Sequence, residues 1–161
     1  MGIGSLCGLL AGCQHDPWAD QFLKSQPANG DLVGTYRVDS DTLARRISIP
    51  MSTKTLTISQ DAEIVLSADH KAQFLHVPEI HEPAIQTCVV SGAGSWDLGR
   101  NDAYFVVNVQ IQPQDNPQLV DGCEPTYYGQ LILYGKKPPY KLHITIGDPD
   151  SGDAMQFKRV N

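Results

Sequence analysis

The sequence predicts an all-β domain, an antiparallel up-and-down meander of about eight to ten strands closed as a small barrel or folded as a β-sandwich. From residue 32 onward, apolar and polar residues alternate with a period of two, which is typical of strands with one buried face. Short segments rich in Gly, Pro and Asp separate these runs and indicate turns. Charged residues make up only 19% of the chain, and the β-favouring residues Val, Ile, Thr and Tyr are frequent. Such a meander must hide its edge strands by closing or by stacking two sheets.

The first half of the domain is expected to form strands joined mostly by tight turns. Ser40 is a cap-like start for a short helix within residues 39–46, and Pro50 ends that connection. Turns are expected at residues 60–61 and 68–70. The predicted strands are residues 32–38, 54–59, 63–67 and 71–77.

The second half begins with a loop over residues 78–83, followed by short strands at 85–91 and 95–98. Gly92 and Gly94 between those two strands indicate a bulge or a sharp bend. Residues 103–112 give the clearest strand, with one apolar and one polar face. The apolar face of that strand holds Phe105, Val107, Val109 and Ile111, and the polar face holds Asn108, Gln110 and Gln112.

A long loop over residues 113–125 precedes the last three predicted strands. Lys136-Lys137-Pro138-Pro139 and residues 147–152 form the turns between them. The strands themselves are residues 127–134, 140–146 and 155–160.

Leu10-Ala11-Gly12-Cys13 closes a short apolar run over residues 3–11 and resembles the lipobox of bacterial lipoproteins. The resemblance implies a signal peptide over residues 1–12 and acylation of Cys13, with fatty acids such as palmitate. A lipidated tether over 13–31 and the β-domain over 32–161 then follow. Gln14 in place of Asp implies the bacterial outer membrane, facing the periplasm. The apolar run lacks a leading Lys or Arg, which leaves open a start codon upstream of Met1.

Several observations bear on this envelope location. Three acyl chains hold a protein stably on a membrane surface, and the sequence has no apolar stretch long enough for a transmembrane helix. The net charge of −6 argues against a nucleic-acid partner.

In the tether, Asp16 and Pro17 can begin a helical turn that places Trp18 and Phe22 on one face. This turn either docks on the domain or rests Trp18 in the membrane interface.

Two short stretches at opposite ends of the domain resemble the lipocalin and wider calycin barrels. Gly34-Thr35-Tyr36 resembles the Gly-x-Trp motif of that family, with Tyr at the Trp position. Phe157-Lys158-Arg159 resembles the late strand whose arginine packs across that ring. The resemblance implies barrel closure by Arg159 against Tyr36, a cation–π contact that can also seal a barrel of another family.

The four cysteines divide by compartment. Cys7 leaves with the signal peptide and Cys13 is acylated, so Cys88 and Cys123 remain as an even pair. In an oxidising periplasm this pair is expected to form a disulfide, which would fasten the long loop to the strand near residue 85. The alternative is two unrelated buried thiols.

Three groups of polar residues have side chains that could carry chemistry. His76, Glu79, His81 and Glu82 have residue types that bind zinc, but Pro78 and Pro83 around them favour a solvated loop. Asp148, Asp150 and Asp153 miss the EF-hand spacing and fit ordinary turn chemistry.

Ser91 and Ser95 belong to no nucleophile motif. The sequence therefore predicts no enzyme, no cofactor and no metal, with the residues around His76 and His81 as the weak exception.

Two functions remain. The first is a membrane-anchored module that binds an envelope protein through the loops at 78–83 and 113–125. The second is a lipocalin-like carrier of a small apolar ligand. The barrel interior separates them, because a filled interior leaves no room for a ligand. The side chains expected to fill it are Phe74, Phe105, Leu142 and Phe157.

The strand at residues 127–134 is apolar on both faces. Leu131 and Leu133 point one way, and Tyr128, Ile132 and Tyr134 point the other. We expect the second face to be covered either by the tether around Trp18 and Phe22 or by the disulfide-held loop.

Overall fold

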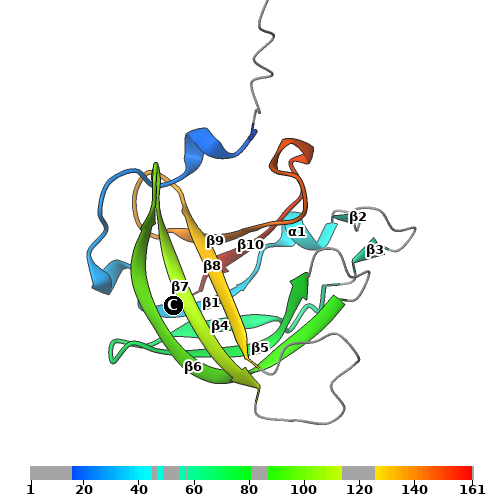
Figure 1. The fold of residues 1–161 in the computed structure, drawn as a ribbon, viewed down its shortest axis with the longest axis horizontal. Helices are drawn as coiled ribbons and strands as arrows, with labels where there is room; N and C mark the ends of the chain where they lie inside the picture. Colours follow the sequence, from blue (N-terminus) through cyan, green and yellow to red (C-terminus); the bar gives the residue numbers. More distant parts are fainter. Residues whose placement is uncertain are drawn as a thin grey trace, which may run out of the picture.

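A computed structural model describes residues 16–44, 47–48, 55–56, 58–80, 87–113 and 126–160. Eight strands form one closed antiparallel barrel in which each strand pairs with the next along the chain and the last pairs with the first (Figure 1). The barrel strands are β1 (Gly34–Val38), β4 (Glu63–Leu66), β5 (Lys71–Ile80), β6 (Thr87–Asn101), β7 (Tyr104–Pro113), β8 (Tyr127–Tyr134), β9 (Lys141–Thr145) and β10 (Ala154–Arg159). The predicted all-β meander is confirmed, and it closes as a barrel rather than a sandwich.

The connection between β1 and β4 holds the remaining elements of this half. Helix α1 (Ser40–Ala44) is followed by the two-stranded pair β2 (Ile47–Ser48) and β3 (Thr55–Leu56). Of the expected strand at 54–59, Thr55 and Leu56 form strand β3 and Ile58 and Ser59 lie outside any strand, whereas Lys54 and Thr57 lie outside the described residues. Asp39 rather than Ser40 caps α1, because its Oδ1 accepts a hydrogen bond from the Asp41 backbone at 3.4 Å.

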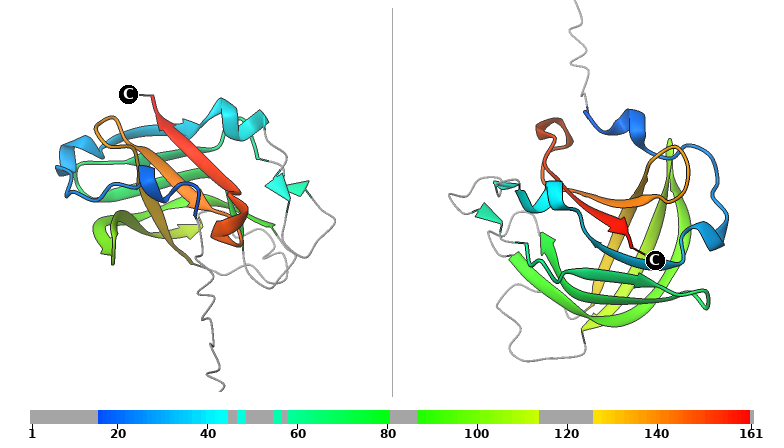
Figure 2. Two further views of the ribbon diagram at one scale, coloured as in Figure 1. Left: turned by 90° about the horizontal axis from the view of Figure 1, so that it is seen from above. Right: turned by 180° about the vertical axis from the view of Figure 1, so that it is seen from behind.

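The barrel closes where β1 pairs with both β4 and β10; Figure 2 shows β10 beside β1 from a second direction. Tyr36 lies opposite Arg159 across this seam. The Tyr36 hydroxyl donates to the carbonyl of Leu32 at 2.7 Å, and Arg159 Nη1 donates to the carbonyl of Asp31 at 3.1 Å. Burial raises the pKa of Tyr36 to about 12, against an opposing effect of Arg159. The two residues thus fasten the turn before β1 to the seam, while the cation–π contact itself stays a prediction.

Residues 16–23, here called the N-terminal strap, pack against the barrel. The predicted helical turn is the 3-10 helix η1 (Ala19–Gln21). Leu23 then inserts between two strands, since its N–H donates to Leu133 O at 2.9 Å and its carbonyl accepts from Phe105 N at 2.8 Å. Trp18 Nε1 donates to Gly152 O at 3.0 Å. Docking on the domain is the alternative that the structure supports.

The strap covers part of the outer face of β8. Trp18 and Phe22 contact Tyr134 edge-on, with ring centroids 6.0 and 6.5 Å apart. The expected cover by the tether is confirmed there. The cover by the strap does not reach the other end of β8, where Tyr128 is 69% exposed.

Strand β6 differs from the expectation of two short strands at 85–91 and 95–98. It runs unbroken through Gly92 and Gly94. A Cβ atom on Gly94 would lie 1.8 Å from Gln110 O, so this glycine permits close approach of β7 rather than a bend. The bulge lies in the partner strand β5, where the register shifts between Phe74 and Val77.

The predicted loop over 78–83 was also wrong at its start. Strand β5 continues to Ile80, and Pro78 pairs with Val89 of β6. β4 ends its pairing with β5 at Leu75, so among the described residues Pro78 has a strand neighbour on the β6 side only. A proline can occupy such a position because no ladder partner needs its missing N–H.

Replacing Gly94 with Ala tests the close approach of β6 and β7. The added methyl group has to push the Gln110 backbone away, so we expect the free energy of unfolding to fall by about 1–3 kcal/mol. Urea denaturation followed by circular dichroism measures the change. Gly30→Ala is the matched control, because a Cβ there meets nothing within 4 Å; an equal loss in both variants would contradict the packing.

Candidate functional site

Several residues predicted to carry chemistry lie outside the described residues: Cys13, Cys123, His81 and Glu82. Acylation of Cys13, the Cys88–Cys123 disulfide and the zinc cluster therefore stay predictions. Cys88 itself is 5% exposed in β6.

The bulge in β5 holds His76 in a fixed position. Its backbone has a φ of 49°, which is uncommon for a residue with a side chain. The His76 N–H donates to Ser91 Oγ at 2.9 Å, and its Nδ1 lies 2.8 Å from Asp61 Oδ2. Hydrogen bonds from Ser59 and His76 hold the pKa of the Asp61 carboxyl below its ordinary value. Ser91 thus bonds the backbone of His76 and not its ring, so these residues do not form a nucleophile and base pair.

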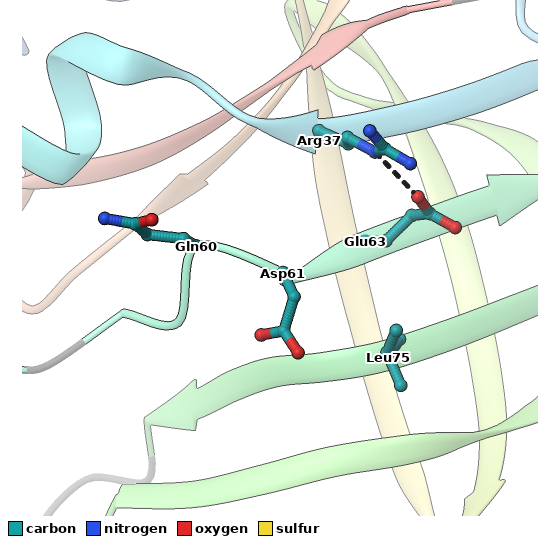
Figure 3. Close-up of a pocket in the computed structure, with 5 residues that line it drawn as sticks. All are labelled: Arg37, Gln60, Asp61, Glu63 and Leu75. Carbon is teal, nitrogen blue, oxygen red and sulfur yellow. Dashed lines mark hydrogen bonds and ion pairs between the residues drawn. The ribbon is translucent and has the colours of Figure 1, made fainter.

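A surface hollow of about 350 Å³ lies beside this bulge. Arg37 Nε of β1 and Glu63 Oε2 of the neighbouring strand β4 form an ion pair of 2.9 Å in its wall, as Figure 3 shows. Asp61, in the turn before β4, and the exposed side chain of Leu75 on β5 also line it. The residues lining the hollow are Arg37, Gln60, Asp61, Glu63 and Leu75. Such a hollow can receive a polar side chain of another protein.

The outer face of β6, β7 and β8 is nearly free of charge, and we call it the amide face. Asn108 donates to Asp97 at 3.0 Å and accepts from Gln130 at 3.1 Å. Gln110 donates to the Tyr128 hydroxyl at 3.1 Å. These bonds hold the side chains in rows across the three strands. The amide face comprises Ser95, Asp97, Asn108, Gln110, Gln112, Tyr128 and Gln130.

Large apolar side chains stay exposed on the strands that carry the amide face and the hollow. Tyr128 of β8 is 69% exposed, Val89 of β6 is 61% exposed and Leu75 of β5 is 41% exposed. The sequence indicated Tyr128 as an outward apolar residue but gave no sign that it would stay uncovered. The charge-poor face emerges only when β6, β7 and β8 are set side by side.

The barrel interior is packed with large side chains. Phe74, Phe105, Leu142 and Phe157 all belong to one continuous core cluster, as predicted. Other large side chains with less than 2% exposure lie among them. They are Tyr36, Leu32, Ile64, Leu66, Ile111, Leu131, Leu133 and Ile146.

The predicted acidic cluster at Asp148 and Asp150 stabilises a turn. Asp148 caps the 3-10 helix η3 (Pro149–Ser151), since its carboxylate accepts from Asp150 N at 3.0 Å. Gly152 ends that turn with a φ of 70°, the left-handed conformation that glycine favours. Within the described ranges, no three His, Cys, Asp or Glu side chains are grouped so that they could hold a metal ion.

A polar network that the sequence did not indicate leads from Asp39 to His143 under the strap. Lys141 Nζ donates to Asp39 Oδ2 at 2.5 Å and to Gln156 Oε1 at 3.3 Å. Gln156 Nε2 lies 3.3 Å from Nδ1 of His143, a ring with no exposed surface. Burial acts to raise the pKa of Asp39, but the hydrogen bond and the charge of Lys141 outweigh it and lower that pKa.

Comparison with known proteins identifies no relative. No family model, no curated protein and no solved structure matches the chain. The fold places it among eight-stranded antiparallel barrels, an architecture consistent with the lipocalin-like barrel expected from the sequence. None of the helices in the described ranges is long and apolar enough to cross a membrane.

The pKa of Asp39 gives a pH-dependent prediction. A lowered pKa means that the folded protein favours the carboxylate, so this stabilisation is present above about pH 4 and is lost as the pH falls further. We expect Asp39→Asn to lower the free energy of unfolding by about 1–3 kcal/mol at pH 7. The difference from the unsubstituted protein should shrink toward pH 2. Urea titrations across this range test it, with the exposed neighbour Asp41→Asn as control; a pH-independent difference would argue against the Lys141 pairing.

Proposed function

We propose that the protein is a lipid-anchored protein of the bacterial envelope whose barrel binds a protein partner through its outer surface. The observation that carries this proposal is the filled interior. A ligand cavity leaves its lining side chains with surface that a water molecule can touch. Side chains at the centre of the barrel, such as Tyr36, Phe157 and Leu142, have 0% exposure. Among the described residues, a core packed in this way leaves no room for a guest molecule.

The outer surface supports a protein partner. Interface centres are depleted of charged residues and enriched in aromatic side chains. The amide face carries one carboxylate, Asp97, and presents the exposed ring of Tyr128. Its amides are held in rows before any partner arrives, which lowers the entropy lost on binding. Val89 of β6 and Leu75 of β5 add exposed apolar surface between the amide face and the hollow.

The alternative is a carrier of a small apolar ligand. The eight-stranded closed barrel favours it, because barrels of this strand number either fill with side chains or hold one small molecule. The packing of the described core favours the first of these. We propose no catalytic activity, since the described polar groups pair with one another in structural roles.

The anchor is tested by replacing Cys13 with Ser. Without acylation, the protein should move from the membrane fraction to the soluble fraction, because nothing else in the proposal holds it on the bilayer. Fractionation of cells followed by immunoblotting measures the distribution. Ser5→Ala in the signal region serves as control and should remain in the membrane. A Cys13→Ser variant that stays bound after a high-salt wash would refute the lipoprotein assignment.

The amide face is tested by site-specific photo-crosslinking in intact cells. A photoreactive amino acid at Val89 or at Tyr128 should give an adduct of one common mass, whereas the exposed position Lys158 should give none. Lys158 is the control because β10 lies opposite β6 in the strand order. Gln110→Lys should abolish the adduct at Tyr128, since it would bury an unpaired charge in the interface. Equal labelling at all three positions, or an adduct unaffected by Gln110→Lys, would exclude this surface.

A further inference from the structure

His143 is a buried titratable side chain that the proposed binding surface does not use. It points outward from β9, yet it has 0% exposure because the strap covers it. Trp18 and Phe22 contact its ring edge-on, with centroids 5.7 and 5.2 Å away. Tyr134 stacks on it with an interplanar angle of 8°. Three aromatic rings, two of them from the strap, therefore enclose this imidazole.

The hydrogen-bond network fixes which nitrogen of His143 carries the proton. Lys141 can only donate, so Gln156 turns its carbonyl oxygen to Lys141, at 3.3 Å. The Gln156 amide nitrogen then faces His143 Nδ1 at 3.3 Å and donates to it. Nδ1 is therefore the acceptor in a neutral ring. The proton resides on Nε2, which lies 3.4 Å from Thr145 Oγ1.

If Nδ1 of His143 were protonated, its N–H and the Gln156 amide N–H would both be hydrogen-bond donors pointing at each other. The Gln156 amide cannot turn over without presenting its nitrogen to Lys141, which Asp39 holds in place at 2.5 Å. The elements around the ring bring further charge, namely Lys158 on β10 and Asp16 and Asp20 in the strap.

Among the described residues, an amide lies beside Nδ1 and a hydroxyl beside Nε2. Lys141 Nζ also lies 5.9 Å from the centroid of the Tyr134 ring that stacks on His143. A positive charge on His143 would add to that of Lys141 inside an enclosure of aromatic rings. It therefore costs free energy unless water reaches the ring.

We infer that His143 is a pH-sensitive latch whose neutral form holds the N-terminal strap on the barrel and whose protonation releases the strap. Water reaches the ring most directly when Trp18 and Phe22 leave, since these two strap side chains lie against it. The undocked state then binds a proton that the docked state rejects. Docking is complete above the ordinary histidine value of about 6.5 and weakens up to about tenfold for each pH unit below it.

The consequence for function rests on the proposed lipid anchor. The strap joins Cys13 to the barrel, so its release lengthens the tether between membrane and domain. Residues 14–31 can extend by up to about 3.5 Å each. Acidification would then let the amide face reach a partner farther from the membrane.

Hydrogen exchange of the full chain in detergent micelles tests the latch. Peptides covering residues 16–24 are followed at pH 7.5 and pH 5.5, with labelling times scaled for the intrinsic pH dependence of exchange. We expect strap protection to fall by about tenfold at pH 5.5, while β7 peptides keep theirs. His143→Gln should make strap protection independent of pH. His70→Gln is the control, because this exposed histidine stacks on Trp96 at 4.8 Å, away from the strap.

A second variant keeps the test decisive if His143→Gln perturbs the fold. Gln156→Glu places a carboxylate where Nδ1–H can donate to it, so the strap should stay protected at pH 5.5. Equal protection of the unsubstituted strap at both pH values would overturn the inference, as would release of the Gln156→Glu strap at pH 5.5. Neither result involves the lipid or the partner, so the Cys13→Ser and crosslinking experiments would still decide the proposed function independently.

Discussion

Closure of β1 onto both β4 and β10 is the constraint on which the rest of the structure depends. It leaves no free edge at the seam and fixes a barrel of eight strands, whose interior is just wide enough for side chains. Tyr36 lies at this seam with its hydroxyl bonded to Leu32 O, so the chain entering the barrel is fastened to the same point. Because the interior is then filled by large apolar side chains, we place the function on the outside.

The outside of the barrel divides into surfaces of different character. The strap covers β8 and β9 at Tyr134 and His143. The amide face lies on β6, β7 and β8, and the hollow lies on β1, β4 and β5. Charge pairs such as Arg37 with Glu63 and Lys141 with Asp39 are kept off the amide face. A surface that excludes charge from one face and presents exposed apolar side chains there is suited to a partner that is itself weakly charged.

The sequence predicted those features that depend on local alternation. The two faces of β7 and the core positions Phe74, Phe105, Leu142 and Phe157 followed from a period of two. Alternation alone left barrel and sandwich open, because closure depends on pairing between the first and last strands; only the resemblance at Tyr36 and Arg159 indicated a barrel. Gly92 and Gly94 suggested a bend, whereas the bulge lies at Leu75 and His76, which carry no turn signal. The burial of His143 could not be predicted from the local sequence either, because its neighbours include residues as distant along the chain as Trp18 and Gln156.

The central claim, that the barrel is filled and works through its surface, is tested most directly by asking what the protein carries. The Cys13→Ser protein, isolated from cells under native conditions, can be extracted with organic solvent and analysed by untargeted mass spectrometry. The extract should contain no small molecule in stoichiometric amount, and native mass spectrometry should give the mass of the polypeptide alone. A single apolar compound recovered at about one molecule per chain and lost on unfolding would contradict the filled interior, and would make the protein a carrier.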